Sequence, residues 1–297
     1  MARIKLAENF RAVFYAPFYA THALGFYARE GVDVELLGSS EPGYGVSALL
    51  DGTADITWGG PIRVIKANEG QTKSQLACFC EVVARDPFYL IGRNNGDFKL
   101  ADLPSLRFAA VSEVPTPWMC LQHDLREKGV DLSRLNRMPH RSMADNFEAL
   151  CNNQLDVVQV FEPYPSMALQ VCAGDILYTA SARGPTVYTT FIARREGFEH
   201  HRTAFIRMVH AIQRTQAWLA EHSAEELAEI TASFFPNVTR DILVCSLRRY
   251  RQAEIWARTP DVSQKGFARL AESLLSSGFI ARMPTYEDCV DQSLVLN

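Results

Sequence analysis

The chain has 297 residues, of which 47% are hydrophobic and 22% are charged, so it can form one large or two medium-sized domains with substantial cores. Its formal net charge of −4 lacks the basic excess that binding to nucleic acid requires. No run of about 18 apolar residues occurs, so the sequence predicts no membrane-spanning helix and no membrane insertion.

The chain starts a strand almost at once, at residues 3–6. A secretory signal would need a basic start, an apolar core and a small-residue cleavage site, and the sequence shows none of these. The seven cysteines are odd in number and scattered, unlike those of a disulfide framework. We therefore expect a cytoplasmic protein if the chain is complete, and a periplasmic one if a leader has been removed.

Short strands alternate with helices through the first 60 residues. Strands are predicted at 3–6, 32–36 and 55–58, and a helix that runs to about residue 50 precedes the last of them. This order indicates βαβ units on a mainly parallel sheet. Ligands bind in the loops that follow the carboxyl ends of such strands. Here those loops are rich in aromatic, hydroxyl and glycine residues, which favour a cradle for a small molecule over a charged reaction centre.

The remainder of the chain predicts further strands and a helical end. Strands are expected at 76–83, 88–93, 107–111, 157–161, 176–179 and 187–193, and helices at 118–128, 143–152, 164–173, 203–222, 224–233, 239–250 and 264–277. The chain would cross to a second unit just after the turn at 94–97 and return near 184–186. We therefore predict two α/β lobes, each a mostly parallel sheet flanked by helices. Residues 1–95 and 187–297 would form lobe I, and 96–186 lobe II.

Two crossovers, near 94–99 and 184–188, would connect these lobes. A ligand would lie in the cleft between the lobes, and the crossovers would act as a hinge that closes on it. Gly184, and Gly96 on the other crossover, could absorb the change in backbone dihedral angles.

Hydroxyl groups precede a predicted helix in each lobe. Ser39 and Ser40 come before the helix that ends at about residue 50. Free N–H groups at a helix N-terminus, with serine hydroxyls beside them, could hold a carboxylate, sulfonate or phosphate. The alternative is that one serine merely caps the helix. Ser112 and Thr116 form the matching candidate in the second lobe.

Aromatic residues follow the first and third predicted strands: Tyr15, Phe18, Tyr19 and Trp58. Such rings could stack on a flat ligand or form a wall of the cleft, and the alternative is core packing. We expect Phe14 and Phe26 in the core, and Tyr15, Tyr19 and Trp58 at the cleft. Gly59 and Gly60 would permit a close approach of the backbone to a ligand.

The second lobe offers one carboxylate at the end of a strand. Glu162 could bind a ligand amine or a pyrimidine N–H, or it could cap the helix that follows. The remaining side chains that we assign to the ligand site are Trp118, Phe161 and Tyr188. Arg183 also lies near the return crossover, and Arg85 with Asp86 is interpreted as a structural ion pair.

No metal, cofactor or catalytic set is predicted. Cys78 and Cys80 lie inside an apolar strand without two further metal ligands nearby. Cys120 and His123 are one helical turn apart, but a helix interior is a poor place for a nucleophile. We therefore assign no catalytic residue.

Five short motifs occur in a fixed order along the chain. They are Ala16-Pro17-Phe18-Tyr19, Gly25-Phe26-Tyr27, Glu30-Gly31-Val32-Asp33-Val34-Glu35-Leu36, Gly52-Thr53-Ala54-Asp55-Ile56 and Phe161-Glu162-Pro163. In these motifs the chain resembles the nitrate/sulfonate/taurine and thiamine-pyrimidine (NMT1/THI5-like) group of ABC-transporter solute-binding proteins, over nearly its whole length. The resemblance implies a two-lobed periplasmic-binding-protein type II fold. It also implies a small organic or anionic ligand in the cleft, bound for transport through an ABC permease or for sensing.

Two groups of enzymes also have this type of sequence. Fungal-type thiamine-pyrimidine synthases resemble the family but carry a pyridoxal-phosphate lysine and a pyrimidine-donating histidine after the Gly-x-x-Asp strand. The matching positions here are Gly59 and Arg63, and the cysteine-rich motif of those enzymes is missing. Related desulfinases use a cysteine after the first strand, whereas Cys78 is the first cysteine here. A cytosolic enzyme acting on a small heterocycle or acid is therefore the alternative interpretation, without matched catalytic residues.

Overall fold

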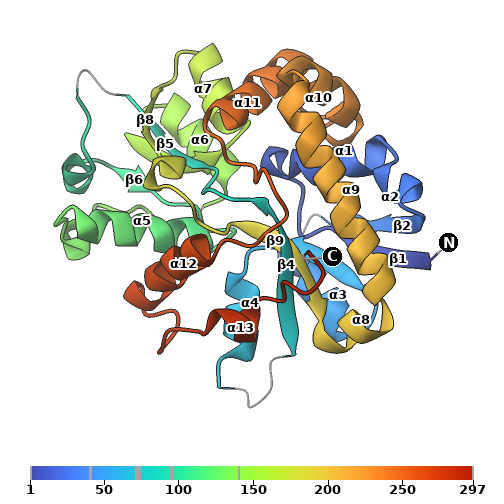
Figure 1. Cartoon of the computed structure of the whole chain (residues 1–297). Helices are drawn as coiled ribbons and strands as arrows, with labels where there is room; N and C mark the ends of the chain where they lie inside the picture. Colours follow the sequence, from blue (N-terminus) through green and yellow to red (C-terminus); the bar gives the residue numbers. More distant parts are fainter. Residues whose placement is uncertain (1, 40–41, 71–74, 94–96, 140, 296–297) are drawn as a thin grey trace.

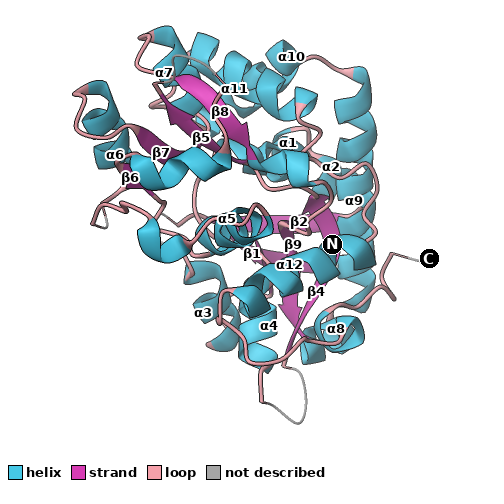
Figure 2. Cartoon of the chain, turned by 90° about the vertical axis from the view of Figure 1, so that its left-hand side faces the viewer, coloured by secondary structure: helices cyan, strands magenta, loops and turns pink. Residues whose placement is uncertain are grey.

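Two β-sheets organise the chain in the computed structural model, which describes residues 2–39, 42–70, 75–93, 97–139 and 141–295 (Figure 1). The first sheet has the order β2-β1-β3-β9-β4, with β1 (Ala2–Ala7), β2 (Val32–Leu37), β3 (Ile56–Gly59), β4 (Leu76–Val83) and β9 (Thr189–Arg194). The second has the order β6-β7-β5-β8, with β5 (Phe88–Gly92), β6 (Phe108–Ala109), β7 (Val157–Phe161) and β8 (Asp175–Thr179). In Figure 2 the second sheet lies above the first.

One strand in each described sheet runs against the others. β1 pairs in parallel with β2 and β3, whereas β9 pairs antiparallel with β3 and β4. In the second sheet, β6 and β7 are parallel, and β5 is antiparallel to both β7 and β8. The reversed strands, β5 and β9, are the ones that the chain enters directly after crossing from the other sheet. The prediction of mostly parallel sheets is therefore confirmed.

Helices cover both sheets. The helices with a long pattern of apolar residues begin and end close to the positions predicted from the sequence. The α-helices are α1 (Ala16–Ala23), α2 (Phe26–Arg29), α3 (Tyr44–Leu50), α4 (Ile62–Asn68), α5 (Thr116–Glu127), α6 (Met143–Cys151), α7 (Tyr164–Gln170), α8 (Arg195–His200), α9 (Arg202–Glu221), α10 (Ala224–Thr231), α11 (Arg240–Gln252), α12 (Gln264–Ser276) and α13 (Tyr286–Cys289), and the 3-10 helices are η1 (Val13–Tyr15), η2 (Leu100–Ser105), η3 (Leu132–Arg134), η4 (Ala180–Arg183) and η5 (Ala232–Phe234). Local signals fix several starts: Ser223 and Glu226 form a capping box at α10, and Ser263 accepts from Gly266 N at α12. In the part of the chain that is described, no helix is long and apolar enough to cross a membrane.

The first crossover lies earlier than the sequence predicts. The strand at 88–93, assigned above to lobe I, is β5, and its hydrogen bonds to β7 and β8 place it in the second sheet. The chain therefore crosses at 84–87, not after 94–97, and Gly96 lies outside the described residues. β5 is buried on both faces, so its sequence pattern carries no information about which sheet it joins. The chain returns to the first sheet through residues 180–188, between β8 and β9.

The two crossovers are bonded to each other. Thr186 N donates to Ala84 O at 2.8 Å and Tyr188 N to Val83 O at 2.9 Å. The Arg183 guanidinium, in the second crossover, pairs with Asp86 in the first at 2.8 Å. The predicted pairing of Arg85 with Asp86 is therefore wrong, because Arg85 instead reaches Glu254 at 3.3 Å.

The C-terminal helices bridge both sheets. α11 packs against α7, and α12 packs against α5 and α4. In Figure 1 and Figure 2, α12 lies next to α5. The predicted assignment of residues 187–297 to lobe I thus leaves out these contacts with the second sheet, which are tertiary and leave no local pattern in the sequence.

A buried carboxyl group, Glu81, sits at an irregularity of β4. One of its oxygens accepts from Ser263 N at 2.9 Å, and the other has no partner among the described residues. Burial, opposed by the Ser263 hydrogen bond, raises the pKa of Glu81 from 4.5 to about 8. The folded chain therefore holds this proton more tightly than the unfolded chain does.

Glu81→Gln is expected to remove a loss of stability at alkaline pH. Since the pKa of Glu81 is higher in the folded state, protonation of Glu81 stabilises the folded protein. This stabilisation is complete below about pH 4.5 and is lost as the pH rises to about 8. The loss is at most about 1.4 kcal/mol per pH unit. Urea unfolding at pH 5 and pH 8.5 should show similar stabilities at the lower pH and a more stable variant at the higher. Parallel pH profiles for the two proteins would contradict this assignment.

Candidate functional site

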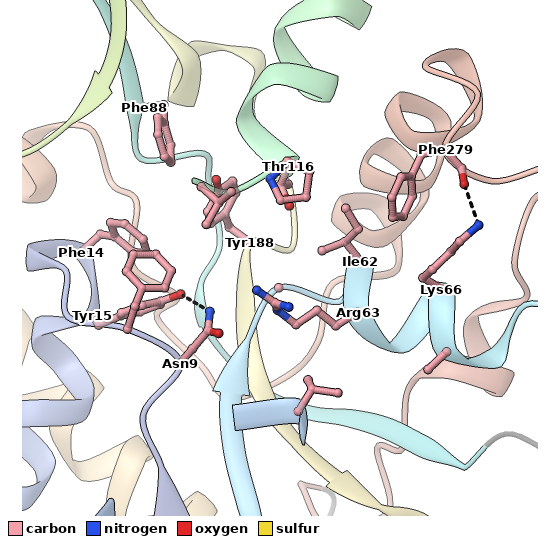
Figure 3. Close-up of a pocket in the computed structure, with 16 residues that line it drawn as sticks. Asn9, Phe14, Tyr15, Ile62, Arg63, Lys66, Phe88, Thr116, Tyr188 and Phe279 are labelled. Atoms are coloured by element: carbon pink, nitrogen blue, oxygen red, sulfur yellow. Dashed lines mark hydrogen bonds between the residues drawn. The ribbon is translucent and has the colours of Figure 1, made fainter. Parts of the chain in front are cut away.

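A cavity of about 330 Å³ lies between the two sheets, beyond the carboxyl ends of β1 and β3. Figure 3 shows residues from several elements converging on it. Its walls come from the β1 loop and η1, α3 and α4, β5, the start of α5, the second crossover and the segment after α12: Asn9, Phe10, Phe14, Tyr15, Val46, Gly60, Ile62, Arg63, Lys66, Ala67, Phe88, Val114, Pro115, Thr116, Tyr188 and Phe279. The site therefore depends on segments that are far apart in the sequence.

Arg63 lies in the first turn of α4 and points into this cavity (Figure 3). Among the described residues, no carboxylate pairs with it and no hydrogen bond occupies its guanidinium. Burial lowers the pKa of Arg63, and the nearby Tyr15 hydroxyl opposes that shift. No Asp or Glu occurs among the described residues that line the cavity. A half-buried guanidinium without a counter-charge is suited to an anion, which it can bind with paired N–H donors.

The turn before α4 brings this guanidinium close to the second crossover. β3 ends at Gly59, and Gly60 and Pro61 lead directly into α4. A side chain at Gly60 would place its Cβ 3.3 Å from Tyr188 O and 3.9 Å from Thr116 Oγ1. A Cβ at this position would be crowded against the backbone of the second crossover, so glycine favours the close approach of the two sides of the cavity.

The second cation of the cavity, Lys66, is already engaged. Its Nζ atom donates to Glu69 Oε2 at 2.6 Å and to Phe279 O at 3.1 Å. The ammonium also lies over the Phe279 ring, 5.1 Å from its centroid. Of the two cations among the described lining residues, Arg63 is therefore the one that is free to bind a ligand.

Aromatic rings form the wall on the other side of Arg63. Phe14 packs on Tyr15, with ring centroids 4.3 Å apart, and meets Tyr188 edge-on at 6.1 Å. Tyr15 Oη accepts a long hydrogen bond of 3.4 Å from Asn9 Nδ2. Burial raises the pKa of Tyr15 to about 12, so its hydroxyl stays neutral near pH 7. This wall thus offers apolar faces with neutral hydrogen-bonding groups at their edge.

Four of the residues predicted for the ligand site line the cavity: Tyr15, Gly60, Thr116 and Tyr188. Gly59 lies just behind it, because a Cβ there would be 3.8 Å from Asn9 Nδ2 and 3.9 Å from Arg63 Cδ. Phe14 belongs to the core, as predicted, and its ring also lines the cavity. Tyr19, expected at the cleft, is buried away from the cavity and donates to Glu8.

Phe18 and Trp58 belong to the core of the first sheet. Their rings stack at 4.6 Å, and Tyr19 meets Trp58 edge-on at 5.7 Å. All three rings are almost fully buried, and none lines the cavity. All residues of η1 and the first six residues of α1 are buried, so their burial does not distinguish the rings that line the cavity from those that pack in the core.

The serines do not stand where the sequence predicts. α3 begins at Tyr44 after Gly43, so Ser39 is not at its N-terminus, and Ser40 lies outside the described residues. Ser112 is exposed, and its hydroxyl donates to Arg141 O at 2.8 Å. Neither Ser39 nor Ser112 lines the cavity. Gly43, with φ of 100°, sets the start of α3 through backbone geometry, so no serine cap is needed.

Trp118, Phe161 and Glu162 also lie outside the cavity lining. Trp118 packs under the Arg137 guanidinium, 4.4 Å from its ring centroid. Phe161 stands one layer behind the wall, with ring centroids 5.3 Å from Phe14 and 5.2 Å from Phe88.

Glu162 is fully buried and its oxygens are occupied. It pairs with Arg249 at 2.7 Å and accepts from Ser166 N at 3.0 Å and Ser246 Oγ at 3.1 Å. Since Ser166 lies in the first turn of α7, the alternative of a helix-capping role is the one that the contacts favour.

Cys120 and His123 do not form a dyad. Burial raises the pKa of the Cys120 thiol to about 12, and the His123 ring lies 3.6 Å from Glu127. No group of His, Cys, Asp and Glu side chains that could hold a metal ion occurs among the described residues.

The sequence analysis did not assign five of the lining residues to the ligand site: Asn9, Phe14, Arg63, Phe88 and Phe279. One signal was available for Arg63, which is a cation placed shortly after a Gly-Gly-Pro turn at the end of a predicted strand. No local signal marks Phe279, because it reaches the site from the far end of the chain.

Known proteins share this architecture. The family model described as NMT1/THI5 like matches residues 13–226. YtlA of Bacillus subtilis (strain 168) is 23% identical over 297 residues, covering 99% of this chain and 89% of YtlA. A solved structure from Bordetella bronchiseptica RB50 has a TM-score of 0.78 at 16% identity and covers 99% of this chain and 96% of its own. The alkanesulfonate-binding protein SsuA from Xanthomonas axonopodis pv. citri, bound to MOPS, has a TM-score of 0.74 at 12% identity and covers 99% of both chains.

These likenesses confirm the predicted periplasmic-binding-protein fold. The family model covers well over half of the sequence. The chain therefore belongs to the NMT1/THI5-like family.

Proposed function

We propose that this protein is a solute-binding protein that holds a small organic anion in the cavity between its sheets. The anionic group of the ligand would bind the Arg63 guanidinium, and its apolar or flat part would lie against Phe14, Tyr15 and Tyr188 (Figure 3). The observation that carries this proposal is a half-buried guanidinium without a partner among the described residues, in a cavity whose described lining has no acidic group.

The neutral groups of the wall support this assignment. Asn9, Thr116 and the tyrosine hydroxyls can donate hydrogen bonds to carboxylate or sulfonate oxygens. Binding an anion would compensate the buried charge of Arg63, which the protein otherwise holds at a cost. A cavity of about 330 Å³ limits the ligand to a small molecule.

The biological role is proposed from relatives. YtlA is named as a candidate binding protein, and SsuA of Xanthomonas axonopodis pv. citri is named as an alkanesulfonate-binding protein. We propose that this chain likewise delivers its ligand to an ABC permease or reports the presence of that ligand as a sensor. Closure of the two sheets about the crossovers at 84–87 and 180–188 is part of the same proposal.

Thermal unfolding with matched anionic and neutral compounds tests the ligand class. The probes are benzenesulfonate against benzenesulfonamide, benzoate against benzamide, and butanesulfonate against butanesulfonamide. An anion at 100 times its Kd should stabilise the protein by about 2.7 kcal/mol, which corresponds to a rise in Tm of roughly 4 °C. The neutral partner of the same shape should give much less. Equal shifts within every pair, or no shift with any anion, would contradict the proposal.

A further inference from the structure

A residue from the far end of the chain closes one side of the cavity. Phe279 follows α12 through the turn at Ser277 and Gly278, where Gly278 has φ of 73°. The chain reverses there, and Phe279 N donates to Leu274 O at 3.0 Å. The next residue, Ile280, is buried in the same apolar cluster as Ile62 and Leu274. Phe279 is thus anchored on both sides, although it lies outside residues 13–226, which the family model matches.

An ion pair at the C-terminal end of α4 holds this segment in place. Lys66 Nζ donates to Phe279 O, and its partner Glu69 accepts from Ala281 N through Oε1 at 2.8 Å. Glu69 Oε2 receives Lys66 Nζ at 2.6 Å. The pair therefore binds the backbone on both sides of Ile280, and the Lys66 ammonium lies over the Phe279 ring as well. Two polar bonds and one cation–π contact fix the position of a ring that is otherwise only partly buried.

α4 carries both the Arg63 guanidinium and the Lys66 ammonium that fixes the Phe279 ring. Arg63 and Lys66 are three residues apart on α4, which is about 4.5 Å along a helix axis. In Figure 3, Phe279, Ile62 and Lys66 lie on one side of Arg63, and Phe14, Tyr15 and Tyr188 lie on the other. The cavity around Arg63 is therefore bounded by the aromatic wall on one side and by the Phe279 ring on the other, so a ligand that lies against the wall can extend past Arg63 only as far as Phe279.

We propose that Phe279 is a specificity-determining residue that limits the length of the ligand, and that Lys66 and Glu69 are positioning residues that hold it there. This inference rests on the proposed function, since it takes the cavity around Arg63 as the ligand site. A larger ring at position 279 shortens the space beyond Arg63, and a smaller side chain opens it. The Lys66–Glu69 pair acts through the position of Phe279 rather than through contact with the anion.

Binding of two homologous series measures this length limit. The probes are the straight-chain alkanesulfonates from methane- to octanesulfonate and the primary alkanesulfonamides of the same lengths, titrated by calorimetry against the whole chain. In the wild type, affinity should stop rising at a certain chain length. Phe279→Ala should favour the members beyond that length by roughly tenfold or more relative to short ones, and Phe279→Trp should shift the limit to shorter chains. Glu69→Gln should make the dependence of affinity on chain length less sharp near the limit, while the affinity for the short members stays the same.

Leu275→Ala is the matched control, because Leu275 is an exposed side chain of the same C-terminal segment and does not line the cavity. It should leave the length profile unchanged. Since Ala and Trp at position 279 shift the limit in opposite directions, a loss of stability in one variant cannot imitate the result.

The outcomes separate this inference from the proposed function. If sulfonates bind through Arg63 and their length profile is the same in wild type, Phe279→Ala and Phe279→Trp, the length limit is wrong and the proposed anion site stands. If sulfonamides bind as tightly as sulfonates and the length limit moves with the residue at position 279, the proposed requirement for an anion is wrong and the length limit stands. No binding by either series overturns both.

Discussion

Arg63→Met is expected to raise the Kd for a small organic anion by roughly 30-fold or more. Removing one partner of a buried, hydrogen-bonded charge pair costs about 2–5 kcal/mol, and each 1.4 kcal/mol is about a factor of ten in Kd. Isothermal titration with the best anion from the thermal-unfolding pairs measures the change directly. Arg63→Lys should lie between, because an ammonium keeps the charge and loses the paired donors of guanidinium.

The same variant should not destabilise the free protein. Arg63 has no ion-pair partner among the described residues, so its removal breaks no salt bridge and relieves a desolvated charge. We expect an unchanged or higher Tm without ligand, together with the loss of affinity. Stability and function then change in opposite directions, which is typical of a residue kept for binding.

Lys66→Met is the matched control on the same helix. It removes the same formal charge from the same cavity, but its ammonium is already bound to Glu69 and Phe279 O. Short anions should therefore lose much less affinity than in Arg63→Met. If the two variants weaken binding equally, the anion responds to the overall potential of the cavity, and Arg63 is not its partner.

The second large effect concerns stability. Arg183→Met is expected to lower the free energy of unfolding by about 3–5 kcal/mol, because it leaves buried carboxylates without their counter-charge. Arg183 pairs with Asp86 at 2.8 Å and with Asp124, and Tyr178 Oη donates to Asp124 at 2.7 Å. The side chains of Arg183 and Asp86 are 6% and 0% exposed, so water cannot replace the lost partner.

Urea unfolding of Arg183→Met and of a surface control decides this prediction. Arg3→Met removes the Arg3–Glu35 pair, whose side chains are 67% and 39% exposed, and should cost less than about 1 kcal/mol. The loss in Arg183→Met should shrink as the pH is lowered, because burial raises the pKa of Asp86 to about 6 and protonation then neutralises that carboxyl group. A loss as small as that of the surface control would mean that the cluster between the crossovers contributes little to stability.

Much of the local structure was predictable from the sequence. The starts and ends of α9 to α12 follow from apolar residues at three- and four-residue spacing and from caps such as Ser223 and Ser263. The alternation of strands and helices indicated two mostly parallel sheets, and the short motifs indicated the family. These features are local, because each depends on residues within one or two turns of helix or a few residues of strand.

The candidate site was only partly predictable. Tyr15, Gly60, Thr116 and Tyr188 were identified because they follow strands or precede a helix, where ligand loops occur. Tyr19 and Trp58 fit the same rule and are core residues, since aromatic side chains carry no mark of the face on which they will be buried.

The tertiary structure alone decided which sheet β5 joins and which residues meet in the cavity. β5 is apolar on both faces, so only its hydrogen bonds to β7 and β8 place it. Arg63 and Phe279 are separated by more than two hundred residues, and they meet only because α12 ends in a turn that folds the chain back over α4. Sequence periodicity reports how a segment buries its own side chains. It carries no information on which distant segment will cover them, and the cavity is made by such contacts.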